Sequence, residues 1–140
     1  MLIKNIMTTN PYTVNENDSI QEIIDFVHNQ DFHHLPVKDA TGKLTGIIST
    51  ADLYRTALKL STQTGGKTYS KKALSGKKAI DVMSKNPITV KEEDSISVAI
   101  ELLLHQGFHA LPVIDNGKIT GIVTSRDVFQ YILQQNLLQS

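Results

Sequence analysis

The 140-residue sequence contains no cysteine and carries no net charge. The lack of cysteine excludes disulfides, thiolate chemistry and cysteine-ligated metal sites. Its 14 basic residues are balanced by 14 acidic ones, whereas a dedicated nucleic-acid-binding protein usually carries a basic surplus. No apolar run approaches the ~20 residues needed to span a bilayer. The N-terminal stretch "MLIKNIMTTN" also lacks a hydrophobic segment long enough for a signal peptide, so we expect a cytoplasmic protein.

What the sequence does contain is a tandem repeat. Residues 6–39 align with 82–115, residues 42–58 align with 117–133, and 24 of these 51 positions are identical. The alignment predicts one repeat at 1–60, a linker at 61–77 and a second repeat at 78–140. Because the linker is rich in Gly, Ser, Thr and Lys, we expect it to be exposed.

Each repeat has the pattern of an α/β unit with the order β-α-β-β-α. Apolar residues at helical spacing predict a helix over 20–27, with Ser19 as its N-cap, and a matching helix over 95–105. The stretches "HHLPV" and "KLTGIIS", and their copies "HALPV" and "KITGIVT", predict a hairpin of two strands in each repeat. The proline in the first strand of each hairpin favours an edge or cleft-lining position. A repeat of about 55 residues is too small to bury a good core alone, so we expect the two repeats to pack on each other.

The helix over 95–105 is more apolar than its counterpart. Val98, Leu102 and Leu104 lie outside its main apolar stripe. Because a helix that is apolar over most of its circumference is buried on several sides, this pattern predicts a subunit interface.

One motif carries the chemistry of both repeats. This motif begins with Gly and continues with two apolar residues, a hydroxyl residue, two further residues and Asp. It ends at Asp52 in the first copy and at Asp127 in the second. One interpretation is purely structural, since a hydroxyl residue followed three positions later by an acid forms a capping box. The other is a nucleotide site. A helix N-terminus suits a phosphate, while the carboxylate can accept hydrogen bonds from the two hydroxyls of a ribose.

The stretches "NPYTV", "DSI", "HHLPV" and "GKLTGIISTADL", and their second copies, resemble paired cystathionine-β-synthase (CBS) domains, the Bateman module. The resemblance covers nearly the whole chain outside the linker. It implies two repeats packed about a pseudo-twofold axis, with two clefts between them that bind adenine nucleotides (AMP, ADP or ATP) or S-adenosylmethionine as regulatory ligands. No cofactor is required. The resemblance also implies that such modules pair into disc-shaped dimers and act on an effector, which here is expected to be a separate, unknown protein.

The resemblance assigns residues to each cleft. One cleft would use Ile122, Thr124 and Asp127 with Thr8, Thr13 and the segment 32–34, which includes His33 and His34. The other would use Ile47, Ser49 and Asp52 with Ser84, Thr89 and the segment 108–110, which includes His109 and Ala110. The position two residues after the hydroxyl residue tends to face phosphates in this family, and it is Arg126 in one repeat and Ala51 in the other. Since arginine matches phosphate geometry, the Arg126 cleft is the better candidate for a phosphorylated ligand, unless Arg126 is simply solvated.

The remaining motifs give weaker indications of function. His33 and His34 point to opposite faces of a strand, and no histidine pair has metal-ligand spacing, so we expect no metal site. The stretch "TGGKT" at 64–68 resembles part of a phosphate loop but lacks its first glycine and its preceding strand. The lysines Lys67, Lys71, Lys72, Lys77 and Lys78 indicate a solvated linker rather than a nucleic-acid site.

These features favour one of four possible functions. A ligand-sensing regulatory module fits the motifs and the resemblance. An interaction scaffold with vestigial clefts remains the alternative, because bulky side chains at 32–34 and 108 lie near the predicted clefts. No combination of nucleophile, base and orienting group suggests an enzyme, and the zero net charge argues against a nucleic-acid binder.

Overall fold

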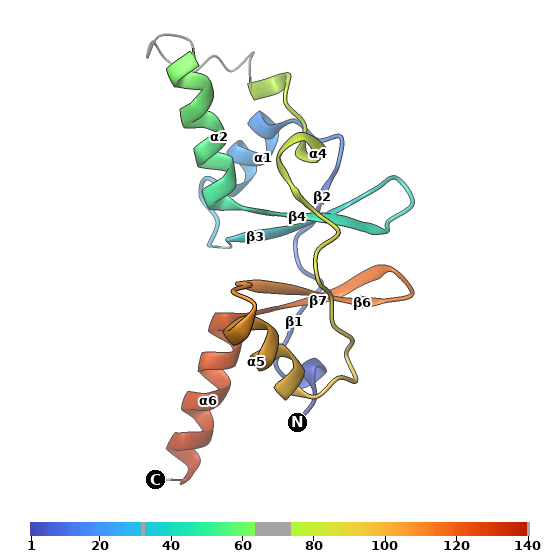
Figure 1. Cartoon of the computed structure of the whole chain (residues 1–140), viewed down its shortest axis with the longest axis vertical. Helices are drawn as coiled ribbons and strands as arrows, with labels where there is room; N and C mark the ends of the chain where they lie inside the picture. Colours follow the sequence, from blue (N-terminus) through green and yellow to red (C-terminus); the bar gives the residue numbers. More distant parts are fainter. Residues whose placement is uncertain (32, 64–73, 140) are drawn as a thin grey trace. The chain divides into compact units, whose positions relative to one another are not determined.

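The computed structural model describes residues 1–31, 33–63 and 74–139, excluding the side chains of 61–63 and 136–139. The chain divides into two compact units, shown in Figure 1. The N-repeat unit is Tyr12–Asn86, and the C-repeat unit combines Met1–Pro11 with Pro87–Ser140. Both units mix helices and strands, which confirms the predicted α/β fold class.

The N-repeat unit follows the predicted order and adds two short elements. In chain order it contains β2 (Val14–Asn15), α1 (Ile20–Val27), β3 (His34–Lys38), β4 (Leu44–Ser49), α2 (Thr50–Gln63), α4 (Ala79–Val82) and β5 (Ser84–Lys85). The sheet order is β2-β3-β4-β5, with β2 parallel to β3 and the other pairs antiparallel. Helices α1 and α2 lie on the same side of this sheet (Figure 1), and the core forms between them and the sheet.

The C-repeat unit is built in the same way. Its elements are η1 (Ile3–Asn5), β1 (Thr8–Thr9), α5 (Ile96–His105), β6 (Ala110–Asp115), β7 (Lys118–Thr124) and α6 (Ser125–Gln139). The sheet order is β1-β7-β6. The predicted leading strand of this repeat is reduced to one parallel bridge between Val90 and Val113.

Each unit buries its own apolar core. In the N-repeat unit most of the buried side chains come from α1, α2, β3 and β4, and Val14 of β2, Leu74 and Ala79 of α4 complete the core. The full set is Val14, Ile20, Ile23, Ile24, Val27, Leu35, Val37, Ile48, Leu53, Leu74 and Ala79. The C-repeat core is smaller and consists of Ile3, Val90, Ala99, Leu111, Val113, Val123 and Val128. The apolar periodicity read from the sequence therefore marks the side chains that face the core.

The leading segments of the two repeats are exchanged between the sheets. Strand β1, in the leading segment of the first repeat, pairs antiparallel with β7 of the second, and β5, in the leading segment of the second, pairs with β4 of the first. Backbone hydrogen bonds hold the exchange, since Ile3 N donates to Asp94 O at 2.9 Å and Ala79 N donates to Asp18 O at 2.9 Å. As a result, residues 1–11 belong to a unit whose other residues lie more than 70 positions away in sequence.

Each exchanged strand passes close to a glycine of the strand that it pairs with. A Cβ atom placed on Gly46 would lie 2.9 Å from the carbonyl oxygen of Ser84, and one on Gly121 would lie 2.9 Å from that of Thr8. Real Cβ atoms essentially never approach backbone this closely. The contact between strands therefore requires these two glycines of the repeated motif.

The predicted exposed linker needs a correction at its C-terminal end. Leu74 is 0% exposed and belongs to the N-repeat core. The carbonyl oxygen of Lys77 accepts a hydrogen bond from Ile20 N at 2.8 Å, and Lys78 forms a bridge with Ser19. A single leucine among polar residues gives no periodic signal, so composition alone missed this anchor. Helix α2 also continues to Gln63, beyond the predicted end of the repeat.

The proline pattern predicted an edge or cleft-lining strand, and the edge alternative is wrong for β3, which lies between β2 and β4. Pro36 is tolerated because β4 pairs along its length, whereas β2 is in register only with Val37 and Lys38. The missing amide proton of Pro36 thus falls beyond the short ladder with β2.

Candidate functional site

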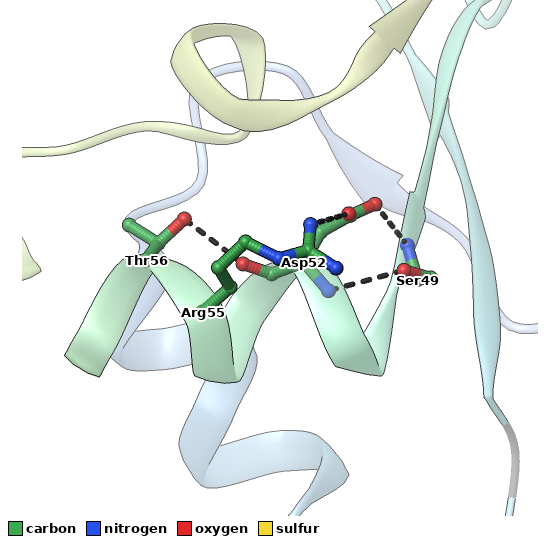
Figure 2. Close-up of polar contacts among 4 residues, drawn as sticks. All are labelled: Ser49, Asp52, Arg55 and Thr56. Atoms are coloured by element: carbon green, nitrogen blue, oxygen red, sulfur yellow. Dashed lines mark hydrogen bonds and ion pairs between the residues drawn. The ribbon is translucent and has the colours of Figure 1, made fainter. Parts of the chain in front are cut away.

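The first corner, residues 49–52, lies where β4 ends at Ser49 and α2 begins at Thr50. Asp52 N donates to Ser49 Oγ at 3.1 Å, and Ser49 N donates to Asp52 Oδ2 at 3.2 Å (Figure 2). These two bonds form a reciprocal capping box at the start of the helix. The structural interpretation of the motif is therefore confirmed at this corner.

The second corner, residues 124–127, has the same geometry between β7 and α6. Asp127 N donates to Thr124 Oγ1 at 3.3 Å, and Thr124 N donates to Asp127 Oδ2 at 2.8 Å. The hydroxyl of Thr124 also lies 3.1 Å from the same carboxylate oxygen. At both corners the capping box uses only one oxygen of the aspartate, so capping does not exclude a ligand at the other oxygen.

The second oxygen distinguishes the two corners. Arg55 Nη1 donates to Asp52 Oδ1 at 2.9 Å, forming an ion pair across one helical turn (Figure 2). The corresponding position in the second repeat is Gln130. Within the described part of the chain, no group donates a hydrogen bond to Asp127 Oδ1.

Arg55 is the site residue that the sequence reasoning missed. Its side chain is 72% exposed. The available signal was the spacing, because an acid and an arginine three positions apart on a helix are neighbours. Arg126 is exposed in the first turn of α6, as the sequence suggested, and its role toward phosphate remains a prediction.

The ionisation of Asp52 reflects this environment. Burial raises the pKa of Asp52, but the hydrogen bonds from Ser49 and the guanidinium of Arg55 outweigh it, so the pKa lies below its ordinary value of 3.8. The carboxylate is therefore ionised at neutral pH and acts as a hydrogen-bond acceptor.

Several predicted site residues are neighbours within one unit. Ile47 is the cross-strand partner of Ser84, and Ile122 is the partner of Thr8. In the hairpin ladders, β3 with β4 and β6 with β7, His34 lies opposite Ser49 and Ala110 lies opposite Thr124. Each histidine-containing segment thus borders the corner of its own repeat, while its predicted role at the other repeat's corner remains a prediction.

The remaining assigned residues divide between the units. Thr13 and His33 belong to the N-repeat unit, while Thr89 and His109 belong to the C-repeat unit. Both histidines are exposed, and both threonines are half-buried. The two predicted clefts therefore remain predictions. Phe32, the "TGGKT" stretch and Lys67, Lys71 and Lys72 lie outside the described residues.

A pocket of about 330 Å³ lies beside the first corner. Its lining comes from α2, from α4 and from Lys77, two positions before α4, and consists of Asp52, Arg55, Thr56, Lys59, Leu60, Lys77, Asp81 and Val82. All of these residues belong to the N-repeat unit. The ion pair of the first corner therefore faces a polar pocket that carries three cations and two carboxylates.

Two negative observations hold for the part of the chain that the structure describes. There, no group of three His, Asp or Glu side chains is placed to hold a metal ion. Across the same residues, no helix combines the length and the apolar character needed to cross a membrane.

Comparison with known proteins identifies the family. The CBS domain profile matches residues 3–59 and 79–134, so the chain belongs to the CBS domain family and contains two such domains. This confirms the resemblance seen in the repeated motifs.

Two solved structures share the fold of a CBS domain pair. CBSX2 from Arabidopsis thaliana, solved in complex with AMP, is 28% identical with a TM-score of 0.76, and the match covers 96% of this chain and 98% of that one. The CBS domain pair of protein MJ0100, solved with 5'-methylthioadenosine and S-adenosyl-L-methionine, is 26% identical with a TM-score of 0.76, covering 96% and 98% of the two chains.

Relatives among curated proteins include much longer enzymes. Homoserine O-acetyltransferase of Methanocorpusculum labreanum is 28% identical over 126 residues, which is 89% of this chain and 23% of that protein. The chain spans about a quarter or less of the length of the first curated relatives it matches. Proteins of the CBS-pair type are generally regulatory.

Proposed function

We propose that the chain is a regulatory module that binds an adenosine-containing ligand through the aspartates of its two corners. The observation that carries the proposal is the divided use of Asp127. One of its carboxylate oxygens caps α6, whereas the other accepts no hydrogen bond from the described residues. A carboxylate with one oxygen fixed in place is a preorganised acceptor for ribose hydroxyls.

The relatives support the adenosine part of the proposal. One neighbour was solved with AMP, and another with 5'-methylthioadenosine and S-adenosyl-L-methionine. These ligands share an adenosine group and differ in charge, so adenosine is the common element. The proposed ligand for this chain is therefore an adenine nucleotide or S-adenosylmethionine. Modulation of a separate effector protein in the cytoplasm is part of the same proposal.

The test is to titrate the whole chain with AMP, ADP, ATP and S-adenosylmethionine, and to measure binding by calorimetry and stabilisation by thermal unfolding. GMP serves as the matched control for the base. A ligand present at 100 times its dissociation constant stabilises the folded state by about 2.7 kcal/mol. We expect such a gain with one adenosine compound, none with GMP, and a loss of the gain in the double variant Asp52→Ala/Asp127→Ala. Equal stabilisation of that variant and the wild type would contradict the proposal.

We also propose that a second copy of the chain covers the exposed apolar faces of the helices. Phe129 is 67% exposed and Leu133 is 60% exposed on α6, and Leu104 is 71% exposed on α5. Tyr54 and Leu58, which correspond to Phe129 and Leu133 in the first repeat, are also large exposed apolar residues. Apolar faces repeated at equivalent positions suit a symmetric interface between identical chains.

Sedimentation of the wild type and of Phe129→Ser/Leu133→Ser tests this assembly. We expect a dimer for the wild type and a shift toward monomer for the variant. A wild-type monomer at all concentrations would contradict the homodimer and would favour the alternative scaffold function, in which another protein covers these faces.

A further inference from the structure

The sulfur of this protein lies in three methionines, because the sequence contains no cysteine. Two of them, Met7 and Met83, occupy equivalent positions in the two repeats. Met7 directly precedes the exchanged strand β1, and Met83 directly precedes the exchanged strand β5. The third, Met1, is 63% exposed. Oxidants that act on sulfur therefore have two targets of equivalent position and one exposed target for comparison.

The two equivalent methionines fill the space beside the strand glycines. Met7 Sδ lies 2.7 Å from the position that a Cβ atom on Gly121 would take, and Met7 Cγ lies 3.2 Å from it. Met83 takes the same place beside Gly46, with its Cγ 2.8 Å from the corresponding position. Both side chains also pack against the apolar core of their own unit. Each thioether is thus held between a glycine of a long strand and the core.

This packing leaves part of each side chain in contact with solvent. Met7 and Met83 are both half-buried, so a small oxidant such as hydrogen peroxide can reach them. The sulfur attacks one peroxide oxygen, the S–O bond forms, and the O–O bond breaks. Sulfur is oxidised by two electrons, and the peroxide is reduced to one molecule of water as a proton passes to the departing hydroxide. The product, methionine sulfoxide, is polar and larger by one oxygen atom.

We propose that Met7 and Met83 are a pair of hydroperoxide-oxidation sites, and that their sulfoxides loosen the exchanged strands β1 and β5. An oxygen placed among apolar side chains loses the hydrogen bonds that water gives it, and this cost favours an opened arrangement. Each exchanged strand is two residues long and pairs in register at two positions, so few contacts oppose its displacement. Oxidation of Met1 should have no such effect, because that side chain is already exposed.

The inference goes beyond ligand binding and does not depend on it. It gives both repeats of the chain the same response to hydroperoxides. The predicted ligand contacts Thr8 and Ser84 directly follow the two methionines. Where the proposed function holds, oxidation should therefore also weaken the binding of an adenosine ligand.

The experiment treats the whole chain with hydrogen peroxide and locates the added oxygen by mass spectrometry of its peptides. Amide exchange is followed by NMR at Asn10 and Asn86, whose N–H groups donate to Thr120 O at 3.4 Å and to Thr45 O at 3.2 Å beside the exchanged strands. We expect sulfoxide at all three methionines, and exchange about tenfold faster at both amides. The thermal midpoint should fall by about 3–6 °C. Treatment with methionine sulfoxide reductases should reverse both changes.

Leucine variants separate the two sites, because leucine has nearly the volume of methionine and no sulfur to oxidise. After peroxide treatment, Met7→Leu should protect the amide of Asn10 but not that of Asn86, and Met83→Leu should do the reverse. Met1→Leu is the matched control and should protect neither amide. If a leucine variant failed to fold, the wild type measured before and after the reductases would still decide the question.

Three results would overturn the inference. One is sulfoxide at Met7 and Met83 with unchanged exchange at both reporter amides. Another is the absence of sulfoxide at these two residues when Met1 is fully oxidised. The third is an equal loss of protection in the wild type and in Met7→Leu/Met83→Leu after treatment. None of these measurements uses a nucleotide, so a failure of the proposed function would leave their outcome unaffected.

Discussion

The two corners have the same backbone and the same capping box but different surroundings for the aspartate. At the first corner, Arg55 pairs with the outer oxygen of Asp52 beside a charged pocket. At the second corner, Gln130 takes the place of that arginine, and an arginine stands instead at position 126. Duplication thus preserved the elements that hold strand and helix together, while the charges around each carboxylate diverged. In a repeat protein, differences between equivalent positions indicate function more specifically than the shared motif does.

The N-repeat core includes a side chain from the segment between the two repeats. Leu74 is fully buried in that core. Leu74→Ala removes buried apolar volume and should lower the free energy of unfolding by about 2–5 kcal/mol. Chemical denaturation monitored by circular dichroism measures the loss. A change below about 0.5 kcal/mol would mean that Leu74 does not hold this segment in the core.

Gly46 and Gly121 test whether the exchanged strands are equivalent. Gly46→Ala and Gly121→Ala each force a methyl group against a backbone carbonyl oxygen 2.9 Å away. Overpacking of this kind costs about 1–3 kcal/mol, and we expect similar losses in thermal denaturation of the two variants. Gly42→Ala is the control for strain without overpacking, because Gly42 has a φ of +88° and nothing within 4 Å of the position of its Cβ atom. A loss at only one of the two strand glycines would show that the exchange is structurally important in one sheet alone.

The pH dependence of stability sharpens the comparison at the first corner. The pKa of Asp52 is lower in the folded state than its ordinary value of 3.8, so its ionised form stabilises the fold above that pH. This contribution is lost as the pH falls below 3.8 and through the folded-state pKa. Asp52→Ala should therefore lower the free energy of unfolding by about 1 kcal/mol at pH 7 and by progressively less toward pH 2.5. Denaturation at a series of pH values checks this, and a difference independent of pH would contradict it.

Much of the fold followed from sequence patterns, for identifiable reasons. The repeated motif occurs twice with its glycine, hydroxyl residue and aspartate, so the hairpins and the helices that follow them were predictable. The Ser19 N-cap was predicted correctly, and Ser19 Oγ accepts from Glu22 N at 3.1 Å. Exchange of the leading segments was not predictable, because it depends on contacts between residues far apart in sequence, such as Ile3 and Asp94.

The candidate site was predictable in its motif but not in its electrostatics. Asp52 and Asp127 were identified from spacing, and both occupy the expected turn between strand and helix. The role of Arg55 depends on which way a long side chain turns, and an exposed arginine has many rotamers. The position of Arg55 in the sequence does not determine whether its side chain extends into solvent or toward Asp52. Only the structure shows the 2.9 Å ion pair with Asp52.

Exchanging the residues that differ between the corners gives the smallest effect and the most direct comparison. Arg55→Gln should lose, and Gln130→Arg should gain, the energy of an acid–arginine pair on one helix, about 0.2–0.5 kcal/mol. Both changes should fade in 1 M salt, where the Debye length is only about 3 Å. Urea denaturation at low and high salt measures them. If Gln130→Arg stabilised the protein equally at both salt concentrations, its gain would come from packing of the arginine stem, and the corners would differ by more than this one charge.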